Sequence, residues 1–140
     1  MRKFNDSIPL KLLQAREVTM GFFRPILQEI PMTEQQWRVI RALNEYDELE
    51  SKQLADVCCI LSPSLTGILS HLEQQGYIQR RKSHEDQRRI LISLSEKARS
   101  MFSELSPRLE ERYRALTDQL SKDELDTLMT LLDKVCKVKT

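Results

Sequence analysis

The feature that most constrains the fold is one change of hydrophobic period. Apolar residues recur at helical spacing over most of the 140 residues, but they alternate from residue 88 to residue 94, where Ile90 and Ile92 share one face. Residues 77–82 precede this segment, and a polar turn at residues 83–87 separates the two. The pattern predicts a single β-hairpin in a chain that is otherwise helical.

Composition excludes several other classes of protein. Three glycines and four phenylalanines are too few for a β-sandwich or a β-barrel. No apolar run approaches the ~18 residues that a membrane span needs, and the N-terminal residues lack the apolar stretch of a signal peptide. Three cysteines are too few for a secreted disulfide scaffold. We therefore expect a cytoplasmic, mainly α protein with no membrane partner.

Six helices are expected around the hairpin. The first runs from about residue 8 to residue 29, with Ser7 as its N-cap and a kink or an end at Pro25. Thr33 and Gln36 form a capping box, Ser51 caps the third helix, and Gly76 ends the fourth. The later helices are expected at residues 33–46, 51–58, 62–75, from 95 onward, and 121–137.

This order of elements predicts one domain over residues 1–140 with two kinds of part. Three helices and a hairpin in residues 33–94 have the order of a winged helix-turn-helix, a DNA-binding module. The long helices in residues 1–32 and 95–140 carry apolar stripes that a second copy of the chain would bury. The expected fold class is mainly α, a winged helix-turn-helix with long N- and C-terminal dimerisation helices.

The net charge of +1 is an average over unequal segments. Residues 76–93 hold five basic and two acidic side chains, a net charge of +3, whereas residues 42–75 hold one basic and six acidic side chains, a net charge of −5. A phosphate backbone responds to charge within a Debye length of about 8 Å. The basic hairpin therefore matters more than the total.

The helix expected at residues 62–75 has two contrasting faces. Five apolar residues lie within about 60° of one line and are expected in the core: Leu61, Leu65, Ile68, Leu69 and Leu72. The opposite face is small, polar and nearly uncharged, which suits a helix in the major groove, although a polar surface without function is the alternative. The DNA-contact residues predicted on it are Ser62, Pro63, Ser64, Thr66, Gly67, Ser70 and His71.

The hairpin supplies the second set of predicted DNA contacts. Arg81, Arg88 and Arg89 can reach phosphates or enter the minor groove. Asp86 lies two residues before Arg88 and can orient its guanidinium through a bidentate hydrogen bond. The alternative is a solvated hairpin whose cations only protect an edge strand.

With these motifs in place, residues 8–138 resemble a MarR-type transcriptional regulator. The wing motif Asp86-x-Arg88 with the strand that follows it and the helix that begins Ser62-Pro63-Ser64 carry the family resemblance. Segments similar to the regulators of homoprotocatechuate (4-hydroxyphenylacetate) degradation operons are residues 12–17, 22–26, 33–38 and 59–69. The resemblance implies a homodimer that binds a pseudo-palindromic operator and responds to a small aromatic carboxylate.

Arg16 is the first candidate for binding that effector. It falls within the apolar arc of the first helix, with Met20 and Phe23, and a guanidinium there is costly unless it is paired. Its partner is either a carboxylate of the protein or a ligand carboxylate. Members of the family that bind aromatic acids use an arginine at the matching position, so the resemblance favours the ligand.

Trp37 and Arg41 complete the predicted effector site. An aromatic wall and a second cation would suit a phenylacetic or benzoic acid between the first two helices. The alternatives are that Trp37 belongs to the core and that Arg41 faces solvent or DNA.

Other chemistries find less support in the sequence. A redox sensor acting through Cys59 or Cys58 is the alternative function, but Cys58 shares the apolar face of its helix and Cys59 has no nearby cation in sequence. No phosphate-binding glycine loop or metalloprotease motif occurs, so no enzyme activity, cofactor or metal site is expected. The predicted function is a ligand-responsive repressor of an aromatic-acid catabolic operon.

Overall fold

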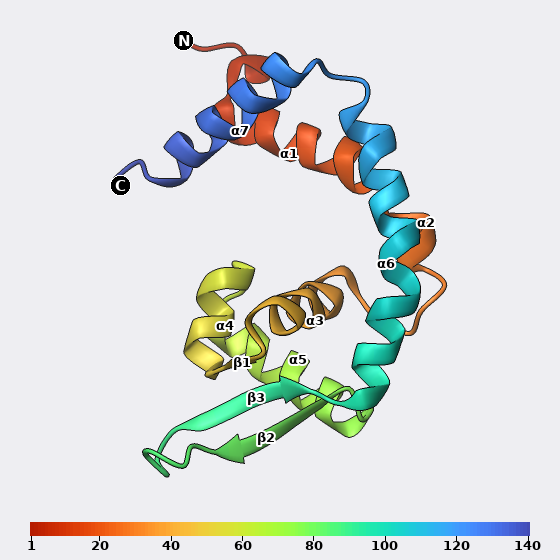
Figure 1. Cartoon of the computed structure of the whole chain (residues 1–140). Coiled ribbons are helices and arrows are strands. Elements are labelled where there is room, and N and C mark those ends of the chain that lie inside the picture. Colours follow the sequence, from red (N-terminus) through yellow and green to blue (C-terminus); the bar gives the residue numbers. More distant parts are fainter. The chain divides into compact units, whose positions relative to one another are not determined.

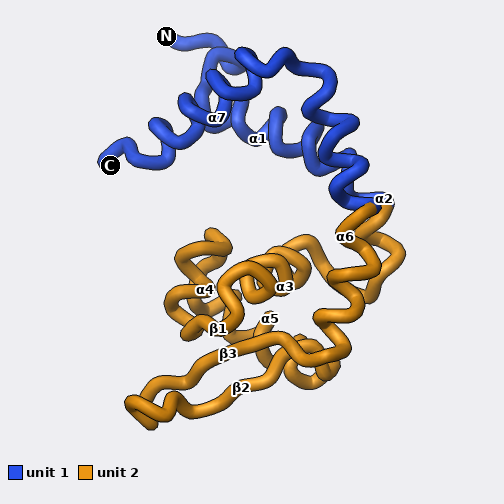
Figure 2. The backbone as a smooth tube through the Cα atoms, in the orientation of Figure 1, with its two compact units in different colours: residues 1–25, 108–140 blue, residues 26–107 orange.

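The computed structural model describes all 140 residues as two compact units (Figure 1). Unit 1 contains Met1–Pro25 and Arg108–Thr140, and unit 2 contains Ile26–Pro107 (Figure 2). The chain passes between the units twice, and a proline lies at each crossing. Proline lacks the N–H that an interior helical residue donates, so the crossing at Pro107, inside a helix, lacks one backbone hydrogen bond, whereas Pro25 lies in the first turn of a helix and costs none.

Unit 1 is helical. It contains a 3₁₀ turn η1 (Phe4–Asp6), α1 (Ile8–Met20), the C-terminal part of α6 (Glu96–Thr117) and α7 (Lys122–Cys136). Ser7 caps α1, since its hydroxyl accepts from the amide of Leu10 at 3.4 Å, as the sequence predicts. The capping box predicted at the start of α7 is also present, with Glu124 N donating to Ser121 Oγ at 3.1 Å.

The first helix is shorter than predicted. Instead of continuing to residue 29, α1 ends at Met20, and a separate short helix, α2 (Arg24–Leu27), follows. The break begins at Gly21, four residues before Pro25. A proline ring collides with the carbonyl of the residue four positions earlier, so the helix is interrupted there and Pro25 sits in the first turn of α2.

Unit 2 contains the predicted winged helix-turn-helix. Three helices are followed by a hairpin: α3 (Glu34–Tyr46), α4 (Ser51–Cys58), α5 (Ser62–Gln74), β2 (Ile78–Lys82) and β3 (Ile90–Leu94). A third strand that the sequence analysis missed, β1 (Glu48–Leu49), pairs with β3, so the antiparallel sheet has the order β1-β3-β2. Two residues are too short a segment to show an alternating pattern.

The core of unit 2 gathers the apolar faces of α3, α4, α5 and β3. Side chains that are almost completely buried include Val39, Ile40, Leu43, Leu54, Leu65, Leu69, Leu72, Ile92 and Leu94. Trp37 of α3 is also buried and stacks on Phe102 of α6, with ring centroids 5.5 Å apart. This packing fixes α5 and the hairpin relative to α3.

Helix ends in unit 2 follow the predictions with one exception. The Thr33–Gln36 capping box opens α3, and Gly76, with φ of +81°, follows the end of α5. The N-cap of α4 is Glu50 and not the predicted Ser51, and the amide of Glu50 donates to Gln53 Oε1 at 2.9 Å. Gln53 has the right spacing to serve a cap at Glu50, so the boundary moves by one residue.

Leu61 does not join the core as predicted. It lies before the first turn of α5, where the backbone is extended, and its side chain is 79% exposed. Leu61 would share the direction of Leu65 only in helical geometry, which begins at Ser62.

No helix is by itself long and apolar enough to cross a membrane. Taken together, α4 and α5 meet the criteria of length and composition, but they are bent by 110° at their junction. Both helices bury their apolar faces in the core of unit 2, as core helices of this composition do.

Candidate functional site: the exposed face of α5, the hairpin and a cavity beside α3

The face of α5 that the sequence analysis predicted to contact DNA is exposed along its whole length. All seven of its members are solvent-exposed: Ser62, Pro63, Ser64, Thr66, Gly67, Ser70 and His71. The apolar side chains of Leu65, Leu69 and Leu72 anchor the opposite face in the core. The helix therefore presents a nearly uncharged surface of hydroxyls, small side chains and one imidazole on a rigid support.

Gly67 in the middle of this face lies against open space. A Cβ added at this position would meet no atom within 4 Å. Glycine in a helix interior costs about 1 kcal/mol relative to alanine, because its backbone is freer in the unfolded chain. The open space beside Gly67 leaves room for close approach to the helix backbone, and contact of Gly67 with DNA remains a prediction.

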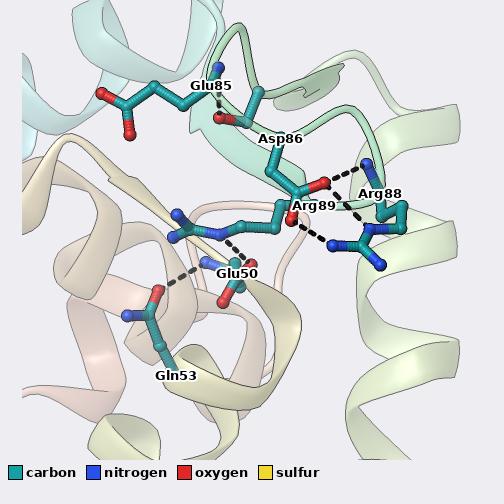
Figure 3. Close-up of polar contacts among 7 residues, drawn as sticks. Glu50, Gln53, Glu85, Asp86, Arg88 and Arg89 are labelled. Carbon is teal, nitrogen blue, oxygen red and sulfur yellow. Dashed lines mark hydrogen bonds and ion pairs between the residues drawn. The ribbon is translucent and has the colours of Figure 1, made fainter.

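The hairpin tip holds Arg88 through the predicted contact with Asp86. The carboxylate accepts from Arg88 Nε at 3.1 Å, from Nη2 at 3.3 Å and from the backbone amide of Arg88 at 3.0 Å (Figure 3). These hydrogen bonds lower the pKa of Asp86, and the nearby Arg89 lowers it further. The Arg88 side chain is nevertheless 91% exposed. It is an oriented cation that projects from the hairpin.

Two other arginines of the predicted DNA-contact set bind glutamates of unit 2. Arg89 donates from Nε to Glu50 Oε1 at 2.6 Å (Figure 3), and this contact raises the pKa of Arg89. Arg81 binds Glu48 through two hydrogen bonds, Nε to Oε1 at 3.1 Å and Nη2 to Oε2 at 2.7 Å. Contact of these two arginines with DNA remains a prediction.

Glu48 and Glu50 are the functional candidates that sequence reasoning missed. Both lie in the acidic segment of residues 42–75, and their partners lie in the basic segment of residues 76–93. The opposite net charges of these neighbouring segments were the available signal. Which carboxylate faces which arginine depends on the strand β1, which no sequence pattern indicated.

A cavity of about 470 Å³ opens beside α3 within unit 2. Its lining combines two cations, one carboxylate, an amide, aromatic rings and apolar groups from α3, α4 and α6: Arg38, Arg41, Ala42, Asn44, Glu45, Tyr46, Val57, Cys58 and Phe102. The guanidinium of Arg38 already donates to the carbonyl of Cys58 at 2.8 Å. Arg41 is exposed at this cavity, so a cation and an aromatic ring border the same space.

The remaining predicted effector residues divide between the two units. Trp37 is a core residue, the alternative that the sequence left open, and reaches the cavity only through its stacking partner Phe102. In unit 1, Met20 and Phe23 are half-buried, and Phe23 stacks on Tyr113 with ring centroids 6.3 Å apart. Arg16 is exposed, with Nη1 at 3.8 Å from Glu17 Oε1.

The cysteines differ in their surroundings. Cys58 is buried as predicted, and burial raises the pKa of its thiol more than the neighbouring Arg38 lowers it. Cys59 is exposed and ends α4 in the left-handed conformation, with φ of 53°. Because a raised pKa keeps a thiol protonated, Cys58 is poorly suited to react with oxidants.

Comparison with known proteins places this arrangement in a family. The model of the MarR family matches residues 32–90, which cover the three helices and most of the hairpin. The HTH-type transcriptional regulator FarR of Neisseria gonorrhoeae is 41% identical over 133 residues, 95% of this chain and 91% of the relative. The homoprotocatechuate degradative operon repressor of Escherichia coli is 40% identical over 130 residues, 93% and 88% of the two chains.

A solved structure extends the likeness to three dimensions. The crystal structure of NadR in complex with 4-hydroxyphenylacetate has a TM-score of 0.85 to this chain at 40% identity, and the match covers 99% of both chains. Sequence identity of this level over almost the whole length accompanies the same order of helices and hairpin. This chain belongs to the MarR family of transcriptional regulators.

Proposed function

We propose that this protein is a cytoplasmic, homodimeric repressor that leaves its operator when it binds an aromatic carboxylic acid. In each subunit α5 enters a major groove, and the hairpin lies at the adjoining minor groove. Two recognition helices about 34–36 Å apart require a pseudo-palindromic operator with half-sites one turn apart. No catalytic step is part of this function.

The DNA-binding part of the proposal rests on one observation, a nearly uncharged helix face beside an oriented cation. Hydroxyls, an imidazole and a glycine on α5 provide hydrogen bonds and close approach to base edges. Arg88 projects from the hairpin in an orientation that Asp86 fixes before DNA arrives. Less conformational freedom is then lost when Arg88 binds a phosphate or the minor groove.

Replacement of Arg88 tests the proposed contact between the hairpin and DNA. A duplex selected by the wild-type protein from a random pool serves as the operator. Arg88→Ala should weaken binding and reduce the dependence of log K on log salt by about 0.9, the contribution of one phosphate contact. Arg2→Ala removes the same charge near the chain terminus and should change neither quantity. Unchanged affinity and salt slope in Arg88→Ala would remove the hairpin from the proposed interface.

The proposal that an aromatic acid binds this protein rests on two arginines and on what related proteins bind or regulate. Arg41 borders a cavity of about 470 Å³ with an aromatic wall, and a guanidinium can bind a carboxylate through two parallel hydrogen bonds. The related NadR binds 4-hydroxyphenylacetate, and a second relative represses a homoprotocatechuate operon. Arg41 and Arg16 are the two candidates to bind the carboxylate, and they are tested separately.

Thermal unfolding with a panel of acids identifies the effector class. The panel contains 4-hydroxyphenylacetate, homoprotocatechuate, protocatechuate and salicylate, with 4-hydroxyphenylethanol as a control that lacks the carboxylate. At 100 times its Kd, a ligand stabilises the folded state by about 2.7 kcal/mol, which raises the Tm by several degrees. The increase should disappear in Arg41→Ala or Arg16→Ala, whichever binds the carboxylate. No shift with any acid would contradict the proposed effector.

Release from DNA requires that the effector bind the non-binding conformation more tightly. The differential affinity for the two conformations is typically ~1–3 kcal/mol. The variant that loses the thermal shift should therefore keep its operator affinity and no longer be released by the acid. If Arg16→Ala instead lost operator binding, Arg16 would be a structural ion-pair partner.

A further inference from the structure

Three arginines of the hairpin, two on β2 and one just before β3, are held by glutamates from outside the hairpin. Arg89 is paired with Glu50, Arg81 with Glu48, and the third pair joins Arg80 Nε to Glu73 Oε1 of α5 at 3.3 Å. Arg88 differs, because its partner Asp86 belongs to the hairpin itself. Neighbouring arginines therefore turn to different partners, Arg88 within the turn and Arg89 toward the start of α4 (Figure 3).

The Arg81–Glu48 pair reaches across the whole sheet. Arg81 on β2 lies opposite Leu91 of β3, and Glu48 on β1 lies opposite Ser93 of β3. Leu91 and Ser93 are two residues apart, so both pairs share one face of the sheet. The guanidinium crosses the central strand to meet the carboxylate, and the contact ties all three strands together.

The Arg89–Glu50 pair joins the hairpin to the start of α4. Glu50 is the N-cap of α4, and Gln53 accepts a hydrogen bond from its backbone amide. The glutamate is thus held at a helix terminus when it receives Arg89. Two glutamates, two residues apart, therefore bind the hairpin to the junction between β1 and α4.

The energetic value of these contacts for folding is small. The Arg89 side chain is 44% exposed and its partner Glu50 30% exposed, and water screens ion pairs at such exposure. Their effect on DNA binding is larger, because a guanidinium that is bound to a carboxylate and more than half covered, like those of Arg81 and Arg89, is one fewer cation for a phosphate, whereas the guanidinium of Arg88 stays 91% exposed beside Asp86. Non-specific affinity for DNA comes almost entirely from such phosphate contacts.

We infer that Glu48 and Glu50 are positioning residues that clamp the hairpin through Arg81 and Arg89 and keep these two guanidiniums from the phosphates of any DNA. The clamp lets Arg88 act as the projecting cation. It raises specificity by lowering the affinity for random sequence while α5 reads the operator. The inference rests on the proposed DNA binding and gives Arg81 and Arg89 a structural role in place of direct contact.

The experiment compares Glu50→Gln with wild type on two labelled duplexes, one of random sequence and one selected by the wild-type protein. Loss of the carboxylate frees Arg89 to bind one more phosphate. On the random duplex, the dependence of log K on log salt should therefore become steeper by about 0.9, and the affinity should increase several-fold. Operator affinity should gain less, so that the ratio of the two affinities falls. Glu48→Gln should act in the same direction through Arg81. Asp56→Asn, an exposed carboxylate on α4 without an ion pair, is the matched control for loss of one charge.

The double variant Glu50→Gln/Arg89→Gln separates the clamp from a direct contact. It keeps the net charge, and its salt slope on both duplexes should equal that of wild type. A slope on the operator that falls by about 0.9 would mean that Arg89 already binds a phosphate, and the inference would be overturned. An unchanged slope on random duplex in Glu50→Gln would overturn it as well. A wild-type protein that binds neither duplex would instead overturn the proposed function.

Discussion

At the scale of single residues, the hairpin tip shows how short polar contacts prepare a cation. The turn is closed by Ser83 N donating to the carbonyl of Arg89 at 2.9 Å and by Arg89 N donating to the carbonyl of Asp86 at 2.9 Å. Asp86 then has its carboxylate free for the side chain and amide of Arg88. Because these contacts are local, the spacing Asp86-x-Arg88 predicted them from the sequence.

The same contacts predict how Asp86 responds to pH. Arg88 lowers the pKa of Asp86 in the folded protein, so the pair stabilises the hairpin above the ordinary aspartate pKa of about 3.9. This stabilisation is lost as the pH falls through the lowered value. The carboxyl carbon of Asp86, followed by NMR, should titrate below about 3.9, and Arg88→Gln should move the midpoint up.

Glu124 provides the control for that titration. Its pKa is lowered by the hydrogen bonds of Ser121 at the start of α7, in the other unit. It should titrate identically in wild type and Arg88→Gln. An Asp86 midpoint that does not move in Arg88→Gln would show that the guanidinium is not the cause of the shift.

At the scale of elements, α5 divides its residues between the core and the exposed face. Leucines that are almost completely buried anchor the helix in the core of unit 2. The first turn of α5 follows Leu61, whose backbone is extended. The two faces can therefore be altered independently. One substitution on each side distinguishes their roles.

The leucines of this segment should differ strongly in their contribution to stability. Leu65→Ala removes a side chain with no exposed surface and should lower the free energy of unfolding by about 2–5 kcal/mol. Leu61→Ala makes the same chemical change where the side chain is 79% exposed, and should change it by no more than about 0.5 kcal/mol. Urea denaturation followed by circular dichroism measures both. Equal losses would place Leu61 in the core after all.

Gly67→Ala should separate stability from DNA binding. Alanine meets no atom of the chain at this position and is the better helix former, so the free energy of unfolding should rise by about 0.5–1 kcal/mol. The added methyl group lies on the face proposed to approach DNA and should weaken operator binding. Denaturation and DNA titration of one preparation give both values. Stronger or unchanged binding would exclude close contact at Gly67.

At the scale of the whole molecule, the helices of unit 1 leave apolar side chains exposed in the single chain. On α1 and α7 these include Ile8, Leu12, Leu13, Val18, Leu128, Met129, Leu131 and Val135. An apolar surface of this extent indicates a protein partner. A second copy of the chain is the partner that the sequence analysis predicted and that the proposed operator symmetry requires.

Loss of this surface should separate the dimer. The wild type should elute with about twice the chain mass of 16.5 kDa in size-exclusion chromatography with light scattering, whereas Leu128→Glu should elute nearer the mass of one chain. Thr130→Glu, about half a turn away on the same helix, adds the same charge off the apolar stripe and should leave the dimer intact. A dimer that survives Leu128→Glu would place the interface elsewhere.

The sequence by itself determined the helices, the hairpin and the pairing of Asp86 with Arg88. Each depends on residues close along the chain: a capping box at Thr33 or Ser121, a left-handed glycine at residue 76, an alternating strand from Ile90. Even the early end of α1 follows from a local rule, because Pro25 acts on the carbonyl of residue 21.

Only the tertiary structure decided which groups meet across the fold. β1 exists because β3 offers it hydrogen bonds, and its two residues carry no pattern of their own. The partners of Arg81 and Arg89 lie 33 and 39 residues away, where many carboxylates of the acidic segment were equally plausible. The burial of Leu61 and Trp37 was likewise not predictable from the sequence. The helical period gives the side of the helix on which a residue lies, but its burial depends on which other parts of the chain pack against that side.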